Sequence, residues 1–286
     1  MPTGDVELAA DRLWSAGAQA VEECAANAGR VCLRTVLAAD DDQSVERLGP
    51  LGLNWTITHV DVDEKPAQTW REFATPIEIS PTLVIAPAWQ PPPPGAAGRL
   101  TVVIEPGSAF GLGDHPTTRL SAAAVERLVP LRGRVLDVGC GSGVLAVIAA
   151  LSGAGATVAV DIADAAVEAT VDNARRNGVR GAIAVSTTTI DALDGPFDLV
   201  VANVLAPALI AMAPHLRRLT SAGGSLVISG VLADNYDHVA QSLAPMIVER
   251  VDVLDGWAAV QLIHPQQAGL RSQTPLVGRA PRQPPW

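Results

Sequence analysis

The pattern of apolar and polar positions changes in character about a third of the way along the chain. From residue 99 onward, short apolar runs alternate with longer segments whose apolar residues recur at helical spacing. Such alternation is typical of a doubly wound, mostly parallel α/β sheet. Strands are expected at 134–138, 157–162, 182–186, 199–203, 225–229 and 257–263, and helices at 118–128, 143–151, 163–178, 205–219 and 235–243.

The pattern before residue 90 predicts a smaller α+β domain. In chain order it indicates a helix at 6–16, strands at 20–24 and 31–38, a helix at 44–48 and a strand at 54–62. This order is one strand short of a two-layer sandwich. We therefore expect the small domain to lack its first strand.

Two segments without periodicity divide the chain. Residues 91–98 contain four prolines followed by glycine and alanine, which is typical of a linker. Residues 266–286 are rich in Gly, Pro, Ser and Arg and are expected to form a flexible tail. The predicted organisation is a small domain at 1–90, a linker at 91–98, a larger domain at 99–265 and the tail.

Composition and charge narrow the possible functions. The 286 residues are 48% hydrophobic and 17% charged, which is enough for a buried core and excludes a disordered chain. The net charge of −10 opposes phosphate backbones, so no direct nucleic-acid partner is expected. Much of the acidity precedes the prolines, because residues 1–98 hold 14 acidic and 6 basic residues, a net charge of −8.

The cysteines and the apolar segments argue against disulfide-rich, zinc-binding and membrane-spanning proteins. Cys24, Cys32 and Cys140 are too few and too scattered for a disulfide framework or a zinc site, so no metal is expected. The longest apolar stretch, 144–151, is far shorter than a membrane span, and no signal segment is recognisable. We expect a cytoplasmic monomer with no membrane partner.

A glycine-rich turn is the strongest candidate for a binding site. Gly139, Gly141 and Gly143 lie between a predicted strand and a predicted helix, where glycine lets a ligand approach the backbone closely. Asp161 ends the next predicted strand, 22 positions after Gly139, where a carboxylate can accept both ribose hydroxyls. This combination predicts a cofactor that contains adenosine.

The residues around the turn favour one cofactor over another. The spacing Gly-x-Gly-x-Gly differs from the Gly-x-Gly-x-x-Gly of dinucleotide sites. Asp137, directly before the turn, would repel a pyrophosphate but suits a sulfonium and an ammonium group, although it can equally cap the following turn. The single Tyr236 and single Lys65 do not favour a dehydrogenase that depends on a Tyr/Lys pair. We therefore expect S-adenosylmethionine.

The segment Glu105–Thr118, with the sequence EPGSAFGLGDHPTT, resembles the signature loop of the PrmA methyltransferases. The glycine turn, Asp161 and three short motifs follow in the family's order, over roughly residues 5–265. The motifs are Asp172-Asn173-Ala174, Asn203-Val204-Leu205-Ala206 and Asp255-Gly256-Trp257.

The resemblance implies a class I methyltransferase domain behind a small domain that recognises the substrate, a protein of the large ribosomal subunit. It also implies which residues contact the cofactor, namely Thr118, Gly139, Asp161 and Asn203. Gly141 and Phe110 are further candidates for cofactor binding, and Phe110 and Gly111 would line the channel for the acceptor amine. This chain departs from the family at Leu112, where threonine is usual, in the missing first strand and in its tail.

Asn203 is the candidate catalytic residue, because its side-chain carbonyl can orient an acceptor amine. No aromatic residue follows it to stack on a planar acceptor, so an aliphatic amine such as lysine is favoured. His115 and Cys140 are expected to have structural roles. A basic protein is the expected substrate, and it would dock on the acidic residues 1–98. The alternatives are another protein lysine or a small amine, a non-catalytic cofactor-binding module, and an oxidoreductase.

Overall fold

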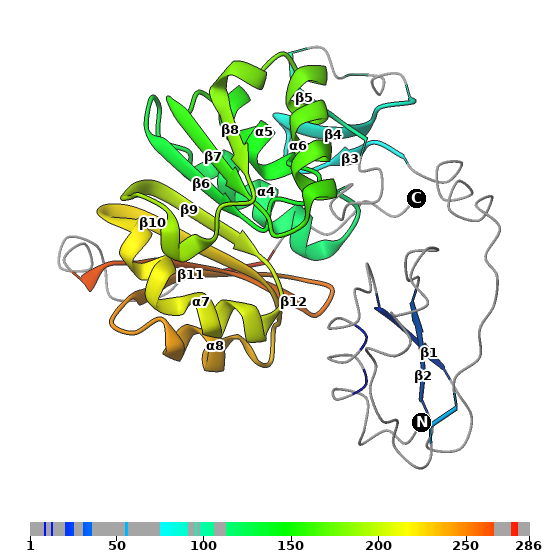
Figure 1. Cartoon of the computed structure of the whole chain (residues 1–286), viewed down its shortest axis with the longest axis vertical. Helices are drawn as coiled ribbons and strands as arrows, with labels where there is room; N and C mark the ends of the chain where they lie inside the picture. The colour runs from blue at the N-terminus through cyan, green and yellow to red at the C-terminus, as the bar shows by residue number, and fades with distance from the viewer. Residues whose placement is uncertain are drawn as a thin grey trace. The chain divides into compact units, whose positions relative to one another are not determined.

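The computed structural model describes residues 9, 13, 21–25, 31–35, 55–56, 75–90, 95, 98–105, 113–265 and 276–279. Figure 1 shows how the elements are arranged. The chain divides into two compact units, Met1–Phe73 and Ala74–Trp286, which are described separately.

The first unit contains an antiparallel hairpin. Strand β1 (Val21–Ala25) pairs with β2 (Val31–Thr35), and Val21 lies opposite Thr35. Ala9 and Leu13, four positions apart, are helical, and Ala9 is buried. These features agree with the predicted first helix and confirm the two predicted strands. The predicted helix at 44–48 and most of the predicted strand at 54–62 lie outside the described residues.

The second unit is built on an eight-stranded sheet with the order β13-β11-β12-β10-β9-β6-β7-β8. Its strands are β6 (Arg134–Val138), β7 (Ala156–Val160), β8 (Ile183–Ser186), β9 (Phe197–Asn203), β10 (Thr220–Leu232), β11 (Ile247–Leu254), β12 (Trp257–Ile263) and β13 (Leu276–Arg279). The five strands from β8 to β10 are parallel, and β12 is antiparallel to both of its neighbours. This confirms the predicted doubly wound, mostly parallel sheet.

Helices cover both faces of this sheet (Figure 1). They are α4 (Pro116–Leu128), α5 (Val144–Leu151), α6 (Asp164–Arg176), α7 (Ala206–Leu219) and α8 (Tyr236–Ser242), with short 3-10 turns at η2 (Arg180–Ala182) and η3 (Ile190–Ala192). Helix α5 packs between α4 and α6, whereas α7 and α8 pack against each other. Buried Leu209, Leu216 and Leu219 of α7 join the core cluster formed with β9, β10 and β12. None of the described helices is long and apolar enough to cross a membrane.

A small three-stranded sheet was not predicted. It consists of β3 (Ile77–Glu78), β4 (Leu83–Pro87) and β5 (Leu100–Ile104), with β4 and β5 parallel. Parallel neighbouring strands need a crossover connection between them. The proline-rich segment 91–98 is part of the connection between β4 and β5, and so it joins two strands of one sheet. It does not separate the two units, which divide at Phe73 instead.

Two further elements differ from the prediction. The sequence pattern did not predict strand β11, although its valines alternate with charged residues. The segment 266–286 was expected to be irregular throughout, but Leu276–Arg279 forms β13, which pairs in parallel with β11. The physical reason is that β11 offers an unpaired edge to a short segment that contains leucine and valine.

Candidate functional site

The glycine turn follows β6 at the carboxyl edge of the sheet. Gly139, Gly141 and Gly143 have φ values of 72°, 52° and 79°, the left-handed region that favours glycine. A Cβ atom on Gly139 would lie 2.4 Å from Cγ1 of Val204, and one on Gly143 would lie 2.7 Å from Cγ2 of Thr170. Both the backbone conformation and the close packing therefore require glycine here.

Asp161 follows β7 and holds the turn through its carboxylate. Its Oδ2 accepts a hydrogen bond from the Gly141 amide at 3.0 Å, and its Oδ1 accepts one from the Ala163 amide at 3.1 Å. The amides of Gly139 and Cys140 donate to the Val160 carbonyl at the end of the same strand. The structure thus brings Gly139, Gly141 and Asp161 together, as the spacing predicted.

Asp137 is fully buried beneath the turn. Its Oδ2 accepts a hydrogen bond at 3.0 Å from the amide of Ala146, in the first turn of α5. Its Oδ1 has no hydrogen-bond partner among the described residues. Burial raises the pKa of this carboxyl to about 7, and the nearby charge of Asp161 adds to the rise, although the Ala146 hydrogen bond opposes it. Asp137 thus satisfies a backbone amide in the first turn of α5, as the capping interpretation expects.

The first turn of α4 carries Thr118, which is 1% exposed, and no partner among the described residues bonds its hydroxyl. His115 is the N-cap of this helix, because its Nδ1 accepts from the Thr117 amide at 3.3 Å and lies 2.7 Å from the Thr117 hydroxyl. Its ring also meets Trp257 edge to face, with centroids 5.1 Å apart. Burial lowers the pKa of the imidazole, against the opposing charge of Asp114. These contacts confirm the expected structural role of His115.

Asn203 ends β9 at the same edge and lies opposite Ser229 of β10 in the ladder. The next residue, Val204, covers Gly139, and its carbonyl oxygen lies 2.2 Å from where a Cβ of Gly230 would be. Because β6 and β9 are neighbours, Asn203 and the glycine turn meet where the strand order reverses, which is where ligands bind in such sheets. Phe110, Gly111 and Leu112 lie outside the described residues.

Sequence reasoning assigned no role to two supports on α6. Thr170 donates to the Gly141 carbonyl at 3.0 Å. Asn173, fully buried, donates to the Ser142 and Glu105 carbonyls at 2.9 Å and accepts from the Glu105 amide. It therefore fixes both the glycine turn and the start of the signature loop. The sequence signal that points to Asn173 is its position: it is a polar residue on the apolar face of the predicted helix.

Cys140 has the structural role expected for it. Its thiol is buried and accepts a hydrogen bond from the Thr170 hydroxyl at 3.2 Å. Burial raises the pKa of the thiol, so the reactive thiolate is disfavoured. Among the described residues, no three His, Cys, Asp or Glu side chains are grouped so that they could hold a metal ion.

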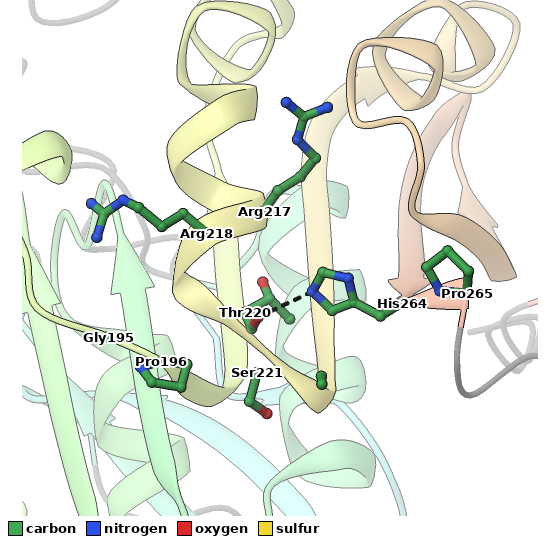
Figure 2. Close-up of a pocket in the computed structure, with 9 residues that line it drawn as sticks. Gly195, Pro196, Arg217, Arg218, Thr220, Ser221, His264 and Pro265 are labelled. Carbon is green, nitrogen blue, oxygen red and sulfur yellow. Dashed lines mark hydrogen bonds between the residues drawn. The ribbon is translucent and has the colours of Figure 1, made fainter.

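A cavity of about 700 Å³ lies elsewhere, at the edge where β9 and β10 begin (Figure 2). Its lining includes Arg217, Arg218 and His264, and the His264 ring bonds the Thr220 carbonyl at 3.1 Å. The arginine side chains point away from each other in Figure 2. They bind backbone carbonyls, including those of Ala244 and Leu193. The cavity therefore does not belong to the site formed by the glycine turn.

Comparisons with known proteins give one consistent result. The family model described as ribosomal protein L11 methyltransferase (PrmA) matches residues 33–264. The ribosomal protein L11 methyltransferase of Bordetella parapertussis is 39% identical over 249 residues, which cover 81% of this chain and 80% of that protein. The one of Dechloromonas aromatica is 38% identical over 242 residues, with the same shares.

A solved structure gives the same result as the sequence comparisons. The crystal structure of ribosomal protein L11 methylase from Lactobacillus delbrueckii subsp. bulgaricus superposes with a TM-score of 0.63 and 32% identity. The match covers 67% of this chain and 99% of that chain.

Proposed function

Because the chain belongs to the ribosomal protein L11 methyltransferase (PrmA) family and is an S-adenosylmethionine-dependent methyltransferase, we propose that it methylates lysine amines of ribosomal protein L11. The observation that supports this most is the convergence of the glycine turn, Asp161 and Asn203 at the point where the strand order reverses. The partner in this proposal is a basic protein, and the enzyme acts as a cytoplasmic monomer.

The described residues fit the cofactor. The turn presents backbone without Cβ atoms, and the carboxylate of Asp161 stands beside it to accept ribose hydroxyls. The unpaired Oδ1 of Asp137 suits a positive group, and the buried Thr118 hydroxyl has a hydrogen bond to give. Gly139, Gly141, Asp161, Thr118 and Asn203 are thus the proposed binding residues, together with Phe110 of the signature loop.

When bound, S-adenosylmethionine supplies an electrophilic methyl group on a sulfonium. The site would have to hold the acceptor nitrogen in line with that methyl group, so catalysis would depend mainly on alignment. In our proposal, Asn203 orients the incoming amine through its side-chain carbonyl.

The lysine must arrive neutral, and deprotonation at pH 7 costs about 4.6 kcal/mol from a reference pKa near 10.4. Desolvation at the site lowers that pKa and supplies part of this energy. In our proposal the proton leaves to solvent before the amine is enclosed.

The test is methyl transfer from labelled S-adenosylmethionine to purified L11, followed by mass spectrometry of the product. We expect label on lysine side chains, and we expect Asn203→Ala to lower kcat at least ten-fold. Label on another protein when the enzyme acts on a whole lysate, with none on L11, would reject the substrate. Cofactor binding without turnover on any protein or amine would favour the non-catalytic alternative.

A further inference from the structure

The carboxyl edge of the large sheet has two halves. β6 and β7 carry the glycine turn and Asp161, which form the cofactor half. β9, β10 and β12 lie on the other side of the reversal point, and their ends at this edge carry Asn203, Leu232 and Trp257. Because Asn203 is the residue proposed to orient the acceptor amine, we call the ends of β9, β10 and β12 the acceptor half.

Two exposed leucines belong to this acceptor half. The large apolar side chains that are exposed among the described residues are Leu131, Ile162, Leu205, Leu232 and Ile247. Leu205 is 49% exposed and follows Asn203 by two positions. Leu232 is 48% exposed and lies two positions beyond Gly230, whose backbone is in contact with Val204.

The surface beside the leucines is acidic. Asp234, Asp237 and Asp255 are exposed, and none of them forms an ion pair within the described part of the chain. The Ala233 amide donates to the Gly256 carbonyl at 2.8 Å, so the turns that carry Asp234 and Asp255 are neighbours. No Lys or Arg occurs anywhere in residues 219–249. No ion pair among the described residues therefore neutralises these three aspartates.

We propose that Leu205 and Leu232, with the three aspartates beside them, form a docking lip for the segment of the protein substrate that carries the acceptor lysine. The segment that fits is basic and has an apolar side chain next to that lysine. The leucines cover the apolar side chain and the lysine methylenes, and so remove water from around the amine. The aspartates attract the basic segment before contact. This inference rests on the proposed function.

The test compares Leu205→Ser and Leu232→Ser, singly and together, with the wild type on intact protein substrate. Serine is a favoured N-cap residue, so Leu205→Ser is compatible with the start of α7. Leu131→Ser is the matched control, because Leu131 is 82% exposed but precedes β6 at the opposite edge. We expect the double variant to raise KM about ten-fold, the order of magnitude for losing a buried leucine contact. Its cofactor Kd and the KM of the control should stay within two-fold.

A second arm tests the charge. Asp234→Asn, Asp237→Asn and Asp255→Asn in combination should lower kcat/KM at low salt and flatten its dependence on ionic strength. Asparagine suits residue 255, whose φ is 48°. If the leucine variants keep the KM of the wild type, or the salt dependence is unchanged in the triple variant, the lip is refuted while methylation by the wild type still supports the proposed function. If the wild type methylates no protein, the proposed function fails and the lip fails with it.

Discussion

Replacing Asp137 by asparagine should stabilise the protein without its cofactor and weaken cofactor binding. The carboxyl is fully buried, one of its oxygens has no partner among the described residues, and burial raises its pKa from 3.8 to about 7. Each pKa unit corresponds to about 1.4 kcal/mol, so ionised Asp137 costs the folded protein about 4 kcal/mol. Asp137→Asn removes that cost but leaves a buried amide N–H₂ in its place, at about 1–3 kcal/mol.

The sign of the effect depends on pH. Because the folded state holds the Asp137 proton more tightly than the unfolded state, the wild type loses stability as pH rises from about 4 to 7. Asparagine does not titrate. The difference in unfolding free energy, variant minus wild type, should therefore grow by roughly 3 kcal/mol between pH 5 and pH 8. The cost of the new amide is the same at both pH values and does not affect this change.

The assay is urea unfolding of both proteins without cofactor at pH 5 and pH 8, with cofactor binding measured by calorimetry at pH 8. We expect the cofactor Kd of the variant to be at least ten-fold higher, because the positive groups of the cofactor lose their buried counter-charge. Parallel stability curves for the two proteins would show that Asp137 does not titrate in this range. An unchanged Kd would show that its free oxygen does not face the cofactor.

Substitutions of three further residues test the site around Asp137. Asp161→Ala should raise the cofactor Kd at least ten-fold in calorimetry, and unchanged affinity would refute the ribose contact. His115→Ala should cost about 1 kcal/mol of unfolding free energy through loss of the α4 cap, whereas His115→Asn should retain it. Because burial lowers the pKa of His115, its contribution is complete above about pH 6.5 and is lost as pH falls, and urea unfolding should show this loss in the wild type only. Asn173→Ala should cost about 2–4 kcal/mol in the same assay, since it removes the hydrogen bonds of a fully buried side chain to the Glu105 amide and to the Glu105 and Ser142 carbonyls.

The large sheet could be predicted because its strands and helices are locally encoded. Buried parallel strands give short apolar runs, and the helices between them give a different period. Strand β11 was not predicted, because the charged residues Glu249, Arg250 and Asp252 are typical of an exposed segment. In the structure Arg250 bonds Asp252, while Gln261 of β12 bonds Glu249. The first contact joins neighbours in one strand, whereas the second depends on the pairing of β11 with β12, which no local pattern shows.

In the candidate site too, the residues that could be predicted belong to local sequence patterns, and the residues that could not be predicted depend on contacts between distant segments. Gly139 and Asp161 carry a recognisable spacing, because a strand, a turn, a helix and the next strand occupy a fixed length of chain. Asn173 bonds Glu105 across 68 positions, and no local pattern shows that contact. The composition of residues 91–98 predicts a linker between domains, because no local pattern shows that the strands on either side of it pair with each other.

In our proposal, Asp137 also makes this glycine turn favour one class of adenosine cofactor. A dinucleotide would bring a pyrophosphate to the turn, and its charge would be repelled by a buried carboxylate that is already costly to ionise. A sulfonium and an ammonium group reverse that balance, because they stabilise the ionised form and lower the pKa of Asp137 on binding. The cost that the carboxylate imposes on the protein without cofactor is thus recovered only with a cationic ligand. Our proposal therefore assigns both the selection of the cofactor and the instability of the unliganded site to the same buried oxygen.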